Sequence, residues 1–367
     1  MGTAISAVEV SAYTVPTATQ PESDGTATWS ATTLVLVELE AGGKRGLGYT
    51  YADLATARIV RDVLAAEVRG KDAFDTIGLW TAAVRAVRNH GRGGVCAMAI
   101  SALDNAAWDL KAKLLSLPLA RLLGQARTSV PAYGSGGFTS YSSAALEEQL
   151  GGWAEQGFSM MKMKVGREPS LDVARVAAAR KAIGPRAALF VDANGAYSRK
   201  QALALSLRFA ELGVSWYEEP VVKTDLAGLR LLRDRAPATL EVAGGEYGYE
   251  LSDFRTFIEA DCLDVIQADV TRCGGVTGFL RAAALCDAFE LPMSTHCAPA
   301  LHVALGCHVP QLRHVEWFFD HQRIERLLFD GAPEPGGGEL RPDLTRPGFG
   351  LSLKLAGAEK FRAALHP

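Results

Sequence analysis

Lys162-Met163-Lys164 is followed by three short apolar stretches that each end in a carboxylate: Leu189-Phe-Val-Asp192, Ser215-Trp-Tyr-Glu218 and Glu241-Val-Ala-Gly-Gly-Glu246. The three carboxylates are 26 and 28 residues apart, which is close to the length of one strand-plus-helix unit. Because successive parallel strands end at the same edge of a barrel, we expect these side chains to meet at one rim. The stretch therefore predicts an α/β barrel that carries an acidic site.

Short apolar segments alternate with helical segments rich in Ala, Leu and Arg from about residue 130 onward. Eight strands are expected in this region, at residues 130–133, 160–165, 188–191, 215–217, 240–243, 263–268, 291–294 and 312–317. An open doubly wound sheet is the alternative, but no GxGxxG follows the first strand, and charged residues recur at the strand ends. The pattern therefore favours a TIM-like barrel.

The first 125 residues have the pattern of a separate α+β unit. Strands are expected at 5–13, 33–40 and 46–51, and helices at 55–68, 75–88 and 95–115. After Arg326 the chain is rich in Gly and Pro, and we expect an irregular tail that packs back on the N-terminal unit. We therefore divide the chain into residues 1–125, 126–326 and 327–367.

Composition excludes several classes of function. The formal net charge of −3 offers no electrostatic reason to bind nucleic acid or an anionic membrane. No apolar stretch reaches the roughly 20 residues that span a bilayer. The six cysteines include no CxxC pair, which is typical of reduced thiols in an intracellular protein. We expect a cytoplasmic protein that binds neither nucleic acid nor a membrane.

Lys162 and Lys164 are two residues apart on a predicted strand, so their side chains share a face. Two ammonium groups beside a divalent cation lower each other's pKa and leave one of them available as a neutral base. The three carboxylates are hard oxygen ligands that suit Mg²⁺. Taken singly, the lysines could instead be snorkelling surface residues and the acids helix N-caps. Their clustering at consecutive strand ends favours a metal-assisted proton-transfer site.

Three further residues end the last predicted strands. Asp269 and His296 fall on neighbouring strands, and a carboxylate on an imidazole nitrogen fixes the tautomer and raises the pKa of the ring. This pair predicts a second acid/base group. Glu316, on the eighth strand, would hydrogen-bond a developing oxyanion if it is protonated, or otherwise form a salt bridge with a lysine. Cys297 has no obvious activating partner, so a nucleophilic role is disfavoured.

With these residues assembled, the chain resembles the enolase superfamily, specifically the mandelate racemase-like group of the mandelate racemase/muconate lactonizing enzyme family. The resemblance rests on Lys162-Met-Lys164, Val191-Asp192-Ala-Asn194, Glu218-Glu219-Pro220, Gly245-Glu246, Asp269 with Arg272-Cys-Gly-Gly-Val-Thr-Gly278, Met293-Ser-Thr-His296, Val315-Glu316 and a helix at 97–111 like the family's domain-closing helix. It covers essentially the whole chain. It implies a modified TIM barrel, (β/α)7β, with an α+β capping domain built from the N-terminal unit and the C-terminal tail.

The resemblance also implies roles for the candidate residues. Mg²⁺ would be held by Asp192, Glu218 and Glu246. The proton-transfer groups would be Lys164, tuned by Lys162, and His296, paired with Asp269 on the opposite face of the substrate, with Glu316 stabilising the enediolate oxygen. The lactonising branch of the superfamily has a lysine at the end of strand six, whereas residues 267–272 here read Gln-Ala-Asp-Val-Thr-Arg. That branch is therefore disfavoured.

The predicted lid indicates the kind of substrate. Residues 16–30 and 49–53 would close over the site, and Asn194, Tyr49 and Tyr51 are the expected substrate contacts. The polar segment 21–30 suits a polyol, so we expect dehydration of a sugar acid, aldonate or aldarate, to a 2-keto-3-deoxy acid. A racemase or epimerase of a 2-hydroxy acid is the alternative, and a non-catalytic metal- or ligand-binding barrel is a third interpretation. Arg92 and His90 are candidate partners for a distal carboxylate, and the resemblance suggests a symmetric homo-oligomer, often of eight subunits.

Overall fold

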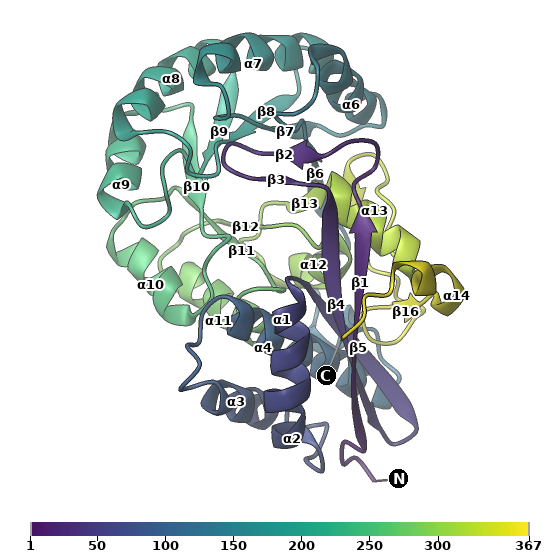
Figure 1. Ribbon diagram of the computed structural model, residues 1–367. Helices are drawn as coiled ribbons and strands as arrows, with labels where there is room; N and C mark the ends of the chain where they lie inside the picture. The colour runs from purple at the N-terminus through teal and green to yellow at the C-terminus, as the bar shows by residue number, and fades with distance from the viewer. Residues whose placement is uncertain (1, 366–367) are drawn as a thin grey trace.

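The computed structural model describes residues 2–365, and within them eight parallel strands form a barrel (Figure 1). They are β6 (Val130–Gly136), β7 (Met160–Lys164), β8 (Ala188–Asp192), β9 (Val214–Glu218), β10 (Glu241–Gly244), β11 (Val265–Ala268), β12 (Met293–Thr295) and β13 (Val315–Phe318). The strands follow one another in the order β12-β11-β10-β9-β8-β7-β6-β13. The ring is completed by hydrogen bonds from the Arg313 amide to the Met293 carbonyl and from the Thr295 amide to the His314 carbonyl. This arrangement confirms the barrel and excludes the open sheet.

In the described part of the chain, seven helices connect the eight barrel strands and lie on the outside (Figure 1). They are α6 (Ser143–Glu155), α7 (Pro169–Ile183), α8 (Arg199–Glu211), α9 (Leu226–Arg235), α10 (Leu251–Glu259), α11 (Gly275–Ala288) and α12 (Pro299–His308). Local sequence sets several of their starts. Proline occupies the first turn of α7, and Ser198 and Gln201 form a capping box on α8. The expected (β/α)7β order is therefore confirmed.

The barrel interior is packed with aromatic side chains beneath the rim. Phe190 and Trp216 stack with ring centroids 5.3 Å apart, and Tyr133 meets Phe190 edge-on. The indole nitrogen of Trp216 also donates a hydrogen bond to Glu218 Oε2 at 2.9 Å. This layer of aromatic side chains packs beneath the charged residues of the rim and supports them.

The N-terminal unit is an antiparallel sheet covered by helices. The sheet contains β1 (Ala7–Pro16), β4 (Ala31–Ala41) and β5 (Lys44–Tyr51), and the helices are α1 (Leu54–Arg58), a π-helical turn (Ile59–Leu64), α2 (Ala65–Val68), α3 (Thr76–Ala86), α4 (Val95–Leu114) and the short α5 (Leu119–Leu123). Helix α4 joins this unit to the barrel. Asn105 donates to the Val270 carbonyl and accepts from the Val276 amide, and so holds the loop that follows β11.

The polar segment 16–30, expected to close over the site, contains a hairpin. Its strands are β2 (Glu22–Ser23) and β3 (Thr28–Trp29), and we call residues 22–29 the lid hairpin. One oxygen of Asp24 accepts hydrogen bonds from the Thr26 and Ala27 amides at 2.6 Å each, which makes the turn. Strands of two residues are too short to leave a periodic pattern in the sequence. Figure 1 shows the hairpin extending from the N-terminal sheet across one end of the barrel.

The C-terminal tail is less irregular than expected. Helix α13 (Phe319–Leu328) runs past residue 326, and the tail adds β14 (Phe329–Asp330), β15 (Glu339–Leu340), β16 (Ser352–Leu353), α14 (Leu355–Ala358) and a 3-10 turn (Glu359–Phe361). It contacts the N-terminal unit as predicted, because the Ala363 amide bonds the Ala12 carbonyl and the Phe349 amide bonds Asp109. Among residues 2–365, no helix has the length and apolar character needed to cross a membrane.

Candidate active site

Three carboxylates converge at the rim, as the sequence predicted. Lys164, Asp192 and Glu218 lie in register across β7, β8 and β9, and Glu246 follows β10 after Gly245. Gly245 has a φ of +121°, and a Cβ there would lie 2.4 Å from the Gln267 carbonyl, so this approach requires glycine. Asp192, Glu218 and Glu246, here called the acid triad, are buried and bring one oxygen each within 4.8 Å of the others.

The two lysines form buried ion pairs with the acids. Lys162 is fully buried, and its Nζ lies 2.6 Å from Glu218 and 2.8 Å from Glu316. Lys164 forms an ion pair with Asp192. Burial opposes the charge on each lysine, but these carboxylates outweigh it and raise both pKa values above the ordinary value. Lys162 does lower the pKa of Lys164, as predicted, but Asp192 raises it by more, so the net shift is upward.

The acid triad fits a hard divalent cation. Oε2 of Glu246 is buried and has no hydrogen-bond partner in residues 2–365. Burial, together with the charge of Asp192, raises the pKa of Glu218 to about 8. Both observations describe an excess of negative charge that the two lysines do not fully neutralise. Unsatisfied carboxylate oxygens that converge in this way are the donor set that Mg²⁺ takes.

His296 and Asp269 form the expected pair. Nδ1 of His296 donates to Asp269 Oδ2 at 2.7 Å, and the other Asp269 oxygen accepts from the Thr271 amide and hydroxyl. Burial opposes a charged imidazole, yet Glu246 and the bond to Asp269 raise the pKa of His296 above its usual value. Its other ring nitrogen, Nε2, lies 3.4 Å from Glu246 Oε2. The imidazole therefore presents one nitrogen to the acid triad.

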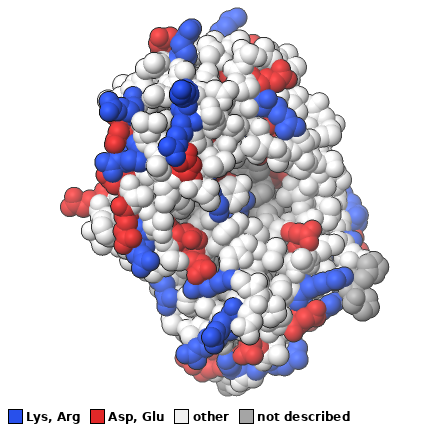
Figure 2. All heavy atoms as spheres, turned by 60° about the vertical axis from the view of Figure 1, so that its left-hand side comes forward, with Lys and Arg blue, Asp and Glu red and all other residues white. Residues whose placement is uncertain are grey.

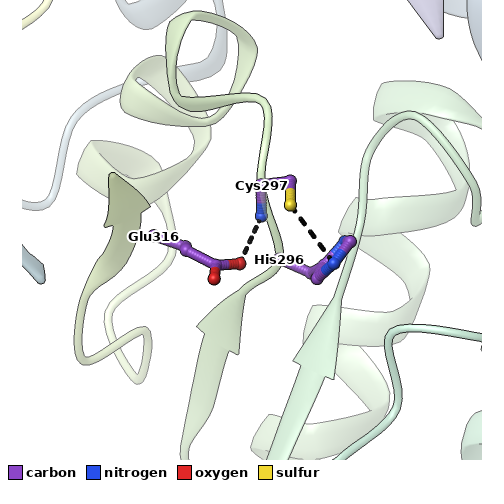
Figure 3. A group of neighbouring side chains, drawn as sticks. All are labelled: His296, Cys297 and Glu316. Carbon is purple, nitrogen blue, oxygen red and sulfur yellow. Dashed lines mark hydrogen bonds between the residues drawn. The ribbon is translucent and has the colours of Figure 1, made fainter. Parts of the chain in front are cut away.

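Figure 3 shows Cys297 between His296 and Glu316. The Cys297 thiol lies 3.2 Å from His296 Nε2, and the Cys297 amide donates to Glu316 Oε2 at 2.7 Å. Burial and then Glu316 raise the pKa of the thiol well above its usual value, so it is not an activated nucleophile. Although burial opposes ionisation of Glu316, Lys162 holds its pKa well below the ordinary value. Of the two roles considered for Glu316, the salt bridge with a lysine is present, because its carboxylate pairs with Lys162.

A cavity of about 410 Å³ lies between the barrel rim and the capping unit. Its lining is Asp24, Trp29, Ala31, Thr32, Thr33, Tyr51, Ala52, Asp53, Lys164, Asn194, Glu246, Tyr247, Arg272, His296, Cys297, Phe318 and His321. Figure 2 shows a face hollowed near its centre, with basic and acidic side chains around the hollow. Lys164, Asn194, Glu246 and His296 thus reach one cavity, while the other predicted rim residues lie beneath it.

The two candidate tyrosines separate. Tyr51 lines the cavity, where its ring stacks on His321 with centroids 3.4 Å apart. Tyr49 is fully buried elsewhere, with its hydroxyl donating to Glu325 at 2.6 Å, and it does not line the cavity. The prediction of Tyr49 as a substrate contact is therefore wrong. Arg92 also lies outside the lining, paired with Glu250 at 3.1 Å, and so does His90.

Two residues beside the acid triad were not singled out for the site from the sequence. Glu219 has a φ of +37° and is buried, and burial followed by the charge of Glu246 raises its pKa well above the ordinary value. Arg272 lies 3.3 Å from Glu246 and 3.6 Å from Asp269, with its guanidinium over the ring of Tyr247. Both belong to the motifs that carried the family resemblance, so the motifs themselves were the available signal.

A (β/α)7β barrel with three carboxylates and two lysines at its rim, closed by a separate α+β unit, defines a member of the enolase superfamily. Residues 145–357 match the enolase C-terminal domain-like family, and residues 7–124 match the mandelate racemase/muconate lactonizing enzyme N-terminal domain. The chain belongs to the mandelate racemase/muconate lactonizing enzyme family, as its motifs predicted.

Curated relatives and solved structures agree with this assignment. A 3,6-anhydro-alpha-L-galactonate cycloisomerase from Streptomyces coelicolor is 35% identical over 77% of this chain and 80% of its own length. An L-talarate/galactarate dehydratase from Salmonella typhimurium is 30% identical over 77% of this chain and 73% of its own length.

Two solved structures superpose closely on the chain. A mandelate racemase/muconate lactonizing enzyme-like protein from Rubrobacter xylanophilus has a TM-score of 0.96 and 54% identity, covering 98% of this chain and all of its own. A racemase from Streptomyces coelicolor with bound magnesium has a TM-score of 0.92 and 30% identity, with coverage of 98% and 100%. Magnesium in that relative agrees with the donor set of the acid triad.

Proposed function

We propose that this protein is a Mg²⁺-dependent enzyme that removes the proton α to a carboxylate and dehydrates a sugar acid to a 2-keto-3-deoxy acid. One observation carries the proposal. Lys164 and His296 enter the same cavity from β7 and β12, on either side of the three strands that carry the acid triad. Two acid/base groups that flank a cation-binding site can act on opposite faces of one substrate. The dehydratase among the relatives supports this reaction class.

Each residue has a distinct part in the proposed site. Asp192, Glu218 and Glu246 would hold Mg²⁺, which when bound would neutralise their charge and stabilise the second negative charge of the enediolate. Lys164 would exchange a proton through Nζ, with Lys162 as its positioning partner through the shared carboxylates. His296 would exchange a proton through Nε2, because Nδ1 is held by Asp269. Asn194, Tyr51 and Glu316 would orient the substrate and the lysines.

The chemical balance of the reaction is simple. One group takes the proton from the α-carbon, and the electron pair of that C–H bond forms a carbon–carbon double bond. The C–O bond at the β-carbon breaks, and the opposite group protonates the departing hydroxyl, which leaves as water. The resulting enol takes a proton at the former β-carbon and becomes the 2-keto-3-deoxy acid. The substrate's configuration determines whether Lys164 or His296 acts first.

A screen of sugar acids with Mg²⁺ tests the proposal. Candidate acids are incubated in D₂O, and both 2-keto acid formation and deuterium at the α-carbon of the remaining acid are measured. We expect one or more acids to give the 2-keto acid, with activity lost in Lys164→Ala, in His296→Asn and on chelation of Mg²⁺. A screen in which no acid is dehydrated would sink the proposal, and exchange that persists in both variants would disprove the site.

Racemisation or epimerisation is the second candidate, because the same two flanking groups can return a proton to the opposite face of the α-carbon. It applies to a substrate without a β-hydroxyl leaving group. Inversion at the α-carbon with solvent deuterium incorporated, and no 2-keto acid, would identify this reaction. An inert barrel that only binds a ligand would produce neither signal.

The proposal extends to the setting of the protein. Its partner would be a small-molecule carboxylate and not nucleic acid, and the chain would assemble in the cytoplasm as a symmetric homo-oligomer of up to eight copies. Light scattering on the purified protein, in the presence and absence of Mg²⁺, tests the assembly. A monomer at micromolar concentration would contradict it.

A further inference from the structure

The capping unit presents negative charge to the cavity. Asp24 from the lid hairpin and Asp53 from the start of α1 both line it, together with the hydroxyl residues Thr32 and Thr33. Each carboxylate is fixed through one oxygen: Oδ1 of Asp24 accepts two amide hydrogen bonds in its turn, and Oδ1 of Asp53 accepts from the Ala55 amide at 2.8 Å. The side of the cavity opposite the rim therefore carries two carboxylates whose positions are fixed by hydrogen bonds from the backbone.

The basic side chains that line the cavity already form ion pairs with carboxylates of the barrel rim. Among the cavity-lining residues of the described chain, Lys164 and Arg272 are the only Lys or Arg. Lys164 is paired with Asp192, and Arg272 lies between Glu246 and Asp269. Both can interact with the end of the substrate that binds at the acid triad. Neither belongs to the capping unit, where the other end of that substrate would lie.

Within residues 2–365, no other lysine or arginine lines the cavity. Lys223 lies behind Tyr247, with its ammonium donating to the Tyr247 carbonyl at 3.1 Å, and it is not part of the lining. Arg92 is paired with Glu250, also outside the lining. The ring of His321 stacks on Tyr51, and burial keeps its pKa well below the usual value, so it is uncharged. A second carboxylate on the substrate would find two acids and no cation to pair with.

We infer that the substrate is a polyhydroxy acid with a single carboxylate, of the aldonate class, and that Asp24 and Asp53 exclude aldarates, which carry a carboxylate at each end. This inference rests on the proposed function, because it assumes that the reacting carboxylate binds at the acid triad. Hydroxyl groups at the far end of a monoacid can donate hydrogen bonds to the two aspartates. A second carboxylate there would lose hydration and face like charge, which opposes binding.

Binding of matched acid pairs tests the inference. Aldonates and aldarates of the same configuration, such as gluconate with glucarate and galactonate with galactarate, are titrated calorimetrically into the Mg²⁺-loaded protein. We expect the tightest-binding aldonate to bind at least about tenfold more tightly than its aldarate. Asp24→Asn with Asp53→Asn should reduce that ratio at least about threefold, and Asp24→Lys should reverse the preference. The matched control is Asp343→Asn, since Asp343 makes the same kind of turn with Thr345 but lies outside the cavity.

The outcomes separate this inference from the proposed function. Equal or tighter binding of the aldarate, a ratio unchanged by the double asparagine variant, or no binding of any pair would overturn the aldonate preference. Turnover is read separately in the same samples. An aldonate that binds with the expected ratio but yields neither 2-keto acid nor α-deuterium would disprove the proposed reaction and leave the preference standing.

Discussion

The barrel rim and the lid hairpin bury carboxylates in opposite ways. At the rim, Glu316 and Glu218 share the fully buried ammonium of Lys162 at 2.8 and 2.6 Å. In the hairpin, Glu22 is buried, and neither of its carboxylate oxygens makes a hydrogen bond within residues 2–365. Asp320, a second acid, is among the charged groups that act on it. The rim is thus held by ion pairs between neighbouring strands, whereas burial of Glu22 in the hairpin favours the neutral form of its carboxyl.

The largest expected effect concerns proton transfer at the rim. With a substrate whose α-proton exchange survives in His296→Asn, so that Lys164 is the base, Lys164→Ala should lower the rate of that exchange about 10³-fold, because a positioned acid/base group contributes between 10² and 10⁴. Deuterium incorporation under saturating Mg²⁺ measures it. Lys200→Ala is the matched control, since Lys200 is exposed on α8. If Lys164→Ala retained more than a tenth of the exchange rate with a correct fold, the proposed role of the lysine would be wrong.

The next prediction tests the compensation of charge at the rim. Lys162→Met should lower the free energy of unfolding by about 3–5 kcal/mol at neutral pH, because it leaves buried carboxylates without their partner. Urea unfolding in EDTA measures the loss, with Lys200→Met as the control. Added Mg²⁺ should recover part of the stability, since it neutralises the same carboxylates. An unchanged urea midpoint would show that the rim does not depend on this ammonium.

A smaller effect is expected when the lid hairpin is displaced. A Cβ on Gly25 would lie 2.5 Å from the Ala193 carbonyl oxygen and 2.7 Å from that of Val165, so Gly25→Ala must move the hairpin away from the rim. We expect KM to rise about tenfold while the free energy of unfolding changes by less than about 0.5 kcal/mol. Gly336→Ala is the control, because a Cβ there meets nothing within 4 Å. Unchanged KM would mean that closure of the hairpin does not contribute to binding.

The same contrast explains what the sequence could predict. The acid triad and the Asp269–His296 pair were found because the carboxyl ends of parallel strands meet at one rim whatever the loops do. The positions of Glu219 and Cys297 were not predictable from strand alternation, because their φ values of +37° and +51° end the two-residue period just past the strand.

Distances decided what the sequence left open. Tyr49 and Tyr51 share one face of β5, yet only the residue at the end of the strand reaches the cavity. The direction of the lysine pKa shift likewise depends on separations from the carboxylates, which spacing along the chain does not specify. The sequence did not predict the lid hairpin, because tertiary contacts alone place it against the rim.

The smallest expected effect is a pH dependence of the lid hairpin. Burial, then Asp320, raises the pKa of Glu22 to about 8, while the charge of Arg323 offsets part of the rise. Since this pKa exceeds the ordinary 4.5, the closed hairpin holds a proton that the open one loses between these values. The contribution of Glu22 to closure is therefore complete below pH 4.5 and is lost as the pH rises through 8.

Glu22→Gln removes this titration without removing the side chain's volume. We expect the Kd of a bound acid to rise about threefold between pH 6 and 8 in the unmodified protein relative to Glu22→Gln. The rise is small because only part of the free energy of deprotonating Glu22 is coupled to closure of the hairpin. The ratio of the two proteins cancels the titration of the rim, which they share. Trp29 emission, which reports on the hairpin itself, should follow the same curve. A ratio that is flat across this range would mean that the buried carboxyl does not govern closure of the hairpin.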